Sequence, residues 1–193
     1  SEMCIRDRDK TGEESLRRLL RMAKIEVPQN IVWGQADFAD YQMRQAVTQI
    51  VDTTGKQVAD RVQEGILDGS SLDDIATAIM DYKEDDKTFG WKRAKTIART
   101  ESTNAISGAT LRSYEVAKDD FGVKIKKAWV ANRDEHTRNE HLKLEAMYGR
   151  DDQAIDTTED FKVDGYAGRG PGLFGKPEMD INCRCAVIPI VTV

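Results

Sequence analysis

The stretch Lys124-Ile-Lys-Lys-Ala-Trp-Val-Ala131 decides the fold class, because the pattern of the sequence changes there. Its charged and apolar residues alternate with the period of a β-strand, whereas the sequence before it has the three-to-four-residue apolar spacing of helices. A second apolar segment, Ile181–Val193, is the other strand candidate, and each strand needs a partner for its backbone groups. We therefore expect an α+β fold, in which an N-terminal helical stalk precedes a small mixed domain with a long helix and a short antiparallel sheet.

Helical patterns fill the sequence before the strand. Pro28 ends the first pattern, Ser71 suits the N-cap of the third, and Gly122 suits the end of the fourth. The helices are expected at Thr11–Ile25, Asp37–Leu67, Leu72–Ile79 and Phe89–Lys118.

The sequence after the strand favours one more helix and a long loop region. Asp134 suits the N-cap of a helix that runs to about Met147. The segment Asp151–Asp180 contains most of the glycines of this half together with Pro171 and Pro177, which is typical of loops. The closing strand Ile181–Val193 follows this loop region.

Two boundaries divide the chain. Residues 1–8, Ser-Glu-Met-Cys-Ile-Arg-Asp-Arg, resemble the translation of an adapter used to prepare sequencing libraries, and we interpret them as a scar without fold or function. Residues 9–86 then form the helical N-terminal region, and residues 87–193 form the mixed domain. Because Cys4 belongs to the scar, it enters no functional argument.

The composition excludes several classes of protein. Of the 193 residues, 39% are hydrophobic and 33% are charged, with a net charge of −5. No apolar run approaches the roughly 18 residues that a membrane span needs, so we expect no membrane contact. The acidic balance disfavours a broad nucleic-acid-binding face and leaves a local basic patch open. Three cysteines do not suit a secreted disulfide scaffold and favour a reducing compartment.

Glu101 interrupts a stripe of small residues on the last long helix. Ala94, Ala98, Ala105 and Gly108 share its helix face, and small residues allow another backbone to come close. A carboxylate there must reach solvent or meet a cation and hydrogen-bond donors. Two interpretations follow: a glutamate at the edge of the stripe, in water, or a buried ion pair with an arginine from the later segment.

Asp134, Arg138 and His141 are spaced to share one face of the expected helix. One interpretation is a capped helix with a solvated polar face. Another is a catalytic Asp–His pair, but no nucleophile motif accompanies it. Our hypothesis is that a structural polar cluster forms where the long helix meets the small sheet, because pairing would offset the cost of burying these charges. Its members would be Arg99, Glu101, Asp134, Arg138, His141 and Arg184.

Cys183 and Cys185 are two residues apart, which in a strand places both thiols on one face with Ile181 and Val187. They could be small buried apolar residues, or two ligands of a zinc ion with His141 as a third. A disulfide between them would strain an extended strand, because α-carbons two residues apart lie roughly 6.6 Å from each other.

Four motifs carry a resemblance when they are taken in order. They are Ala98-Arg-Thr-Glu101, Trp129 with Asp134-Glu-His-Thr-Arg-Asn-Glu-His141, the Pro171 to Pro177 loop, and Asn182-Cys-Arg-Cys185. The set resembles the phage Mu F-like family of minor head proteins, which includes the SPP1 gp7-like head morphogenesis proteins. The match spans roughly residues 90 to 190. Two departures are Leu144-Glu-Ala146, where the family has Leu-Asp-Gly, and Asp180-Ile181, where a histidine or proline is common.

The resemblance implies a structural protein of a tailed phage or prophage, present in the virion head and assembled in the cytoplasm of the bacterial host. It implies action near the portal in head morphogenesis, DNA packaging or ejection, with the portal protein, other capsid proteins and phage DNA as partners and no cofactor. Some members are fused to the end of a portal protein. Two alternatives stay open: a zinc-stabilised binding module, and an ADP-ribosyltransferase-like enzyme, whose site Arg99 and Glu101 resemble faintly.

Overall fold

The computed structural model describes residues 12–25, 52–81 and 90–192. The adapter-like residues 1–8, Pro28 and the first part of the predicted helix Asp37–Leu67 lie outside the described residues. The described part is a mixed α+β structure, which confirms the predicted fold class.

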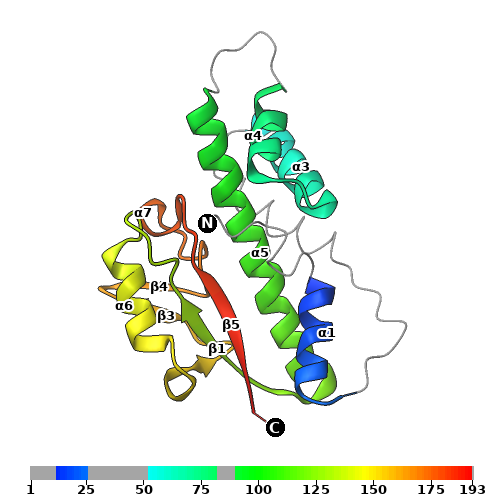
Figure 1. The fold of residues 1–193 in the computed structure, drawn as a ribbon, viewed down its shortest axis with the longest axis vertical. Helices are drawn as coiled ribbons and strands as arrows, with labels where there is room; N and C mark the ends of the chain where they lie inside the picture. Colours follow the sequence, from blue (N-terminus) through cyan, green and yellow to red (C-terminus); the bar gives the residue numbers. More distant parts are fainter. Residues whose placement is uncertain (1–11, 26–51, 82–89, 193) are drawn as a thin grey trace.

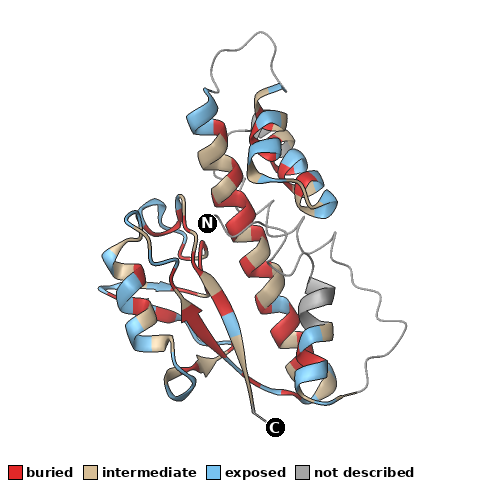
Figure 2. Cartoon of the chain, viewed as in Figure 1, coloured by how far each residue is buried: buried red, intermediate tan, exposed pale blue. Residues whose placement is uncertain are grey.

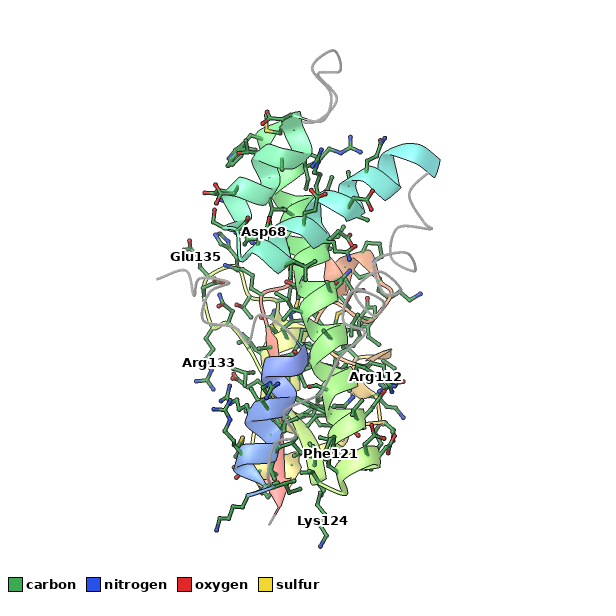
Figure 3. All side chains as sticks on the ribbon, turned by 90° about the vertical axis from the view of Figure 1, so that its right-hand side faces the viewer. Asp68, Arg112, Phe121, Lys124, Arg133 and Glu135 are labelled. Atoms are coloured by element: carbon green, nitrogen blue, oxygen red, sulfur yellow. The ribbon has the colours of Figure 1, made fainter. Side chains whose placement is uncertain are left out.

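Helix α5, Trp91–Phe121, is the longest element and the one against which the others are arranged (Figure 1). Helices α3, Asp52–Asp68, and α4, Leu72–Asp81, lie along its first half, and α1, Gly12–Met22, lies along its second half, as the view in Figure 3 also shows. Gly122 ends α5 in the left-handed conformation with φ 66°, as the sequence predicts, and its N–H bonds to helix carbonyls.

Ser71 caps α4, again as predicted. Its hydroxyl accepts a hydrogen bond from the Asp74 N–H at 3.1 Å, and the Asp74 carboxylate accepts one from the Ser71 N–H at 3.1 Å. This reciprocal pair satisfies two amides that a helix start would leave without partners. Helices α3, α4 and the first half of α5 bury one apolar cluster, which includes Val62, Ile75 and Ala98.

A three-stranded antiparallel sheet packs against the second half of α5. Strand β1, Lys124–Val130, lies between β2, Ile155–Asp156, and β5, Ala186–Thr192. The pairing of β1 with β5 confirms the two predicted strands, with Lys124 opposite Thr192 and Val130 opposite Ala186. The remaining elements are β3, Phe161–Val163, β4, Tyr166–Gly168, α6, Asn139–Tyr148, the 3-10 turn η2, Asp151–Gln153, and α7, Pro177–Asp180.

The closing strand begins at Ala186, not at Ile181 as predicted. Helix α7 runs to Asp180, and Asn182 then adopts a positive φ of 57°, so residues 181–185 turn before the extended chain begins. Ile181 is consequently 42% exposed and does not share a buried face with the two cysteines.

Trp129 is the centre of the second apolar core. It has no exposed surface, and its ring meets those of His141, Phe161 and Phe174 edge-on at 5.3–6.1 Å between centroids. Residues from α1, α5, α6 and the sheet pack into the same core. Figure 2 shows the buried residues of these elements in red. None of the described helices is both long and apolar enough to cross a membrane.

Candidate functional site

The turn at residues 181–185 is docked on the middle of α5 by two threonines. The Thr103 hydroxyl donates to the carbonyl of Cys183 at 2.8 Å, and the Thr100 hydroxyl oxygen accepts from the N–H of Asn182 at 3.0 Å. Thr103 is 5% exposed, so the first of these bonds is sheltered from water. The turn before β5 is therefore positioned by polar contacts to a rigid helix.

Asp134 and Arg184 form a paired ion bridge. Both guanidinium end nitrogens donate to the carboxylate, one of them at 2.6 Å to Oδ1. The carboxylate also accepts from the N–H of His136 at 2.9 Å and from the hydroxyl of Thr137 at 3.1 Å. Partial burial raises the pKa of Asp134, but these hydrogen bonds outweigh it and the pKa lies below its ordinary value. The bridge connects the loop after β1 to the turn before β5.

Asp134 does not cap a helix, contrary to the sequence-based prediction. Arg133 has a positive φ of 52°, and the Asp134 side chain closes a turn onto His136, so helix α6 begins only at Asn139. Arg138 occupies the N-cap position with extended backbone. Asp134, Arg138 and His141 therefore do not share one helix face, because the residues between them are not helical throughout.

His141, Cys183 and Cys185 meet inside the core. The Nδ1 atom of His141 lies 3.9 Å from the Sγ of Cys183 and 3.3 Å from the Sγ of Cys185. The three residues are 1–3% exposed. Both thiols thus lie on one side, as predicted, although they belong to a turn. The hydrogen bond with Cys185 lowers the pKa of the Cys183 thiol, burial opposes this, and His141 lowers the pKa further.

Glu101 is buried, and no ion pair between described residues includes it. It is 8% exposed, and its Oε2 has no hydrogen-bond partner. Burial, and secondly the Asp180 carboxylate, raise the pKa of Glu101 to about 6. The small-residue stripe is buried as the pattern predicts. The predicted ion pair with a later arginine is not what the structure places there, because the neighbouring charge is a second carboxylate.

The predicted polar cluster is divided into separate groups. Asp134 pairs with Arg184, His141 meets the cysteines, and Arg138 donates to the carbonyl of Ile181 at 2.5 Å. Arg99 is half-buried on α5. Spacing along the chain could not separate these groups, because each depends on the turns at residues 133–137 and 181–185.

Sequence reasoning missed two buried polar residues of this part. The Asp180 carboxylate accepts hydrogen bonds from the N–H groups of Phe174 and Lys176, both at 3.0 Å, and so shapes the loop before the cysteines. Lys127 has no exposed surface, donates to the carbonyl of Arg169 at 2.7 Å and has a pKa lowered to about 8, chiefly by burial. Asp180 lies three residues after Pro177, where a short helix that starts at the proline would end, and this spacing could have indicated that the carboxylate binds loop amides. Lys127 breaks the alternation of β1, and nothing in the sequence indicates that it is buried.

A family model described as phage Mu protein F like protein matches residues 56–188, which is more than half of the chain and contains every residue of this site. This chain belongs to that family. Helix α1 lies before the matched segment, although its leucines are part of the core around Trp129.

Three curated proteins are similar to this Mu F-like chain. One from Enterococcus faecalis, called NAD(+)–arginine ADP-ribosyltransferase EFV, is 36% identical over 140 residues, which are 72% of the chain and 26% of that protein. The minor head protein GP7 of Bacillus phage SPP1 is 28% identical over 136 residues, 69% of the chain and 40% of GP7. An uncharacterised Haemophilus influenzae protein is 28% identical over 147 residues, 74% of the chain and 27% of that protein.

The Mu F-like chain thus spans between about a quarter and two fifths of the length of these relatives. A search of solved structures gave no significant match.

Proposed function

We propose that this Mu F-like chain is a structural minor head protein of a tailed phage or prophage. It acts near the portal in head morphogenesis, DNA packaging or ejection. Its partners would be the portal protein and other capsid proteins, with phage DNA as a further contact, and its location would be the virion head after assembly in the host cytoplasm. Family membership and the similarity to the SPP1 minor head protein support this proposal.

The observation that carries the proposal is how the family's motif residues are used. The charged pair Asp134–Arg184 joins two loops, Arg138 holds a backbone carbonyl, and the thiols lie beside His141 in the core. An open pocket of about 580 Å³ lies between α6 and the β3–β4 hairpin, and none of these residues lines it. The motif therefore fixes how segments dock, which suits an assembly protein better than turnover.

Protein analysis of purified virions would test the proposal. Particles from the source phage or the induced lysogen would be separated on a density gradient and quantified by mass spectrometry. We expect the chain, or the longer protein that contains it, in particles at far fewer copies than the major capsid protein. Particles from a strain with this gene interrupted should still form but should lose genome content or infectivity. Absence of the chain from wild-type particles would refute the proposal.

An ADP-ribosyltransferase is the second candidate, favoured by the 36% identity to the enterococcal transferase. The shared segment is only 26% of that protein, so the transferase activity in its name belongs to a much larger chain. In this chain, Arg99 and Glu101 are two apart on a helix, so their side chains leave the helix axis in directions about 160° apart. Glu101 is also 8% exposed, which does not suit a carboxylate that must reach a substrate.

Incubation of the purified chain with labelled NAD and an arginine acceptor separates the two candidates. The structural proposal expects no transfer or NAD hydrolysis above a protein-free blank. Turnover that disappears in Glu101→Gln and persists in Glu115→Gln, on the same helix, would favour the transferase.

A further inference from the structure

We propose that His141, Cys183 and Cys185 bind one zinc ion, as three protein ligands with a fourth position left to water. The site does not depend on the head-protein function proposed above. Its ligands come from α6 and from the turn before β5, which are separated in the sequence and adjacent in the fold. The Nδ1 and two Sγ atoms all lie within 4.8 Å of one another, and all three residues are buried.

The distances between the ligand atoms fit a tetrahedral ion. With zinc–sulfur bonds of about 2.3 Å, a zinc–nitrogen bond of about 2.1 Å and a tetrahedral angle, nitrogen and sulfur are expected about 3.6 Å apart. The Nδ1 atom of His141 lies 3.3 Å from one sulfur and 3.9 Å from the other, on either side of that value. The one ring nitrogen has a single lone pair for two thiol donors, so hydrogen bonding alone accounts less well for both sulfurs than a shared ion does.

The chemistry of the three ligands selects the ion. Two thiolates and one imidazole are soft to intermediate donors, which bind zinc in preference to magnesium or calcium. Two thiolates would also carry two negative charges into a buried site that lies near the carboxylate of Asp180. A divalent cation would neutralise the two thiolates, and the arginine between the cysteines, Arg184, is already paired with Asp134.

The surroundings hold the ligands in place before any ion arrives. Thr103 fixes the carbonyl of Cys183, and the Asp134–Arg184 bridge fixes the residue between the two cysteines. Trp129 packs edge-on against the His141 ring at 5.5 Å between centroids. The Nε2 of His141 has no hydrogen-bond partner in the part of the chain that the structure describes, so the packing against Trp129 sets the ring orientation there. Among the described residues, no further His, Cys, Asp or Glu belongs to the ligand group, which leaves the fourth position to a non-protein ligand.

Metal analysis of the full chain tests the site. The protein would be purified under reducing conditions from zinc-supplemented cells without chelator, and its metal content measured by plasma mass spectrometry. We expect about one zinc per chain, as for other sites with three strong protein ligands. Cys183→Ser, Cys185→Ser and His141→Gln should each lose most of this zinc. His136→Gln, which changes the other histidine with a 73% exposed side chain, should retain it.

Cobalt gives a readout that needs no variant to fold. After chelation, unaltered protein reloaded with cobalt should show the near-ultraviolet absorption of a cobalt–thiolate bond, and one equivalent of added zinc should remove it. In a folded Cys183→Ser or Cys185→Ser protein the band should be largely lost, because the variant keeps only one sulfur ligand and loses most of its metal. Unaltered protein that holds neither zinc nor cobalt, or whose two buried thiols are recovered as a disulfide, would overturn the proposal. Equal zinc loss in His136→Gln and His141→Gln would do the same.

Discussion

Replacement of Glu101 by Gln is expected to stabilise the protein at neutral pH. The Glu101 carboxylate is buried, its Oε2 has no partner, and its pKa rises from 4.5 to about 6. An acid whose pKa is higher in the folded state than in the unfolded state destabilises the fold when it ionises. The cost is absent below pH 4.5, grows as the pH rises to about 6, and is constant above that.

The size of the effect follows from the two pKa values. One pKa unit corresponds to about 1.4 kcal/mol, so the difference between 4.5 and about 6 gives a cost of about 2 kcal/mol at pH 7.5. Glutamine keeps the shape of the side chain and removes the charge. At pH 4 the glutamic acid is itself neutral and buries polar atoms as glutamine does. The gain in free energy of unfolding should therefore be near zero at that pH.

Urea unfolding at pH 4 and pH 7.5 measures this gain, with a chelator present so that no bound cation changes the charge nearby. Glu115→Gln is the matched control on the same helix, because Glu115 pairs with Arg112 and Arg169. That substitution should destabilise by up to about 1 kcal/mol at pH 7.5. If Glu101→Gln also destabilises at pH 7.5, Glu101 has a cation partner and the reasoning is refuted.

Three further substitutions probe contacts that hold the loops in place. Thr103→Val should lower the free energy of unfolding by about 1–3 kcal/mol in urea melts, since it leaves a buried carbonyl without its donor. The control Thr96→Val removes only an exposed bond within the helix and should change that free energy by less than about 0.5 kcal/mol. Gly172→Ala should lower the free energy of unfolding by about 1–3 kcal/mol more than the control Gly175→Ala. Both glycines have a positive φ, but only at Gly172 would the added methyl group overlap a neighbouring side chain, that of Asn104. Arg138→Ala should cost about 1 kcal/mol, and its effect should add to that of Glu101→Gln in the double mutant; a coupling above about 0.5 kcal/mol would contradict the separation of these residues.

The elements that the sequence predicted correctly are those with a long periodic signal. The small-residue stripe of α5, its end at Gly122 and the pairing of β1 with β5 follow from patterns of apolar residues and from one glycine. The capping of α4 by Ser71 is a local interaction within four residues, so it too can be predicted from sequence alone.

The site was less predictable because it depends on turns. A positive φ at Arg133 moves the start of α6, and one at Asn182 moves the start of β5. Each change reassigns which side chains face one another. The sequence indicated that Asp134 and Arg184 carry structural charge, but their pairing, and the position of the Asp180 carboxylate near Glu101, depend on where the loops are placed.

The pairing of β1 with β5 also has a consequence for synthesis on the ribosome. Leu19 and Leu20 of α1 belong to the same core as Val187 of β5, so α5 can cover them first but the core around them is complete only once β5 has emerged. At about 5–20 residues per second, that interval is roughly 10 to 30 s. Helices α3, α4 and the first half of α5 bury their cluster among neighbouring segments and need no such delay. The core that holds the first described helix is therefore completed late in synthesis, whereas the cluster of α3, α4 and α5 is completed early.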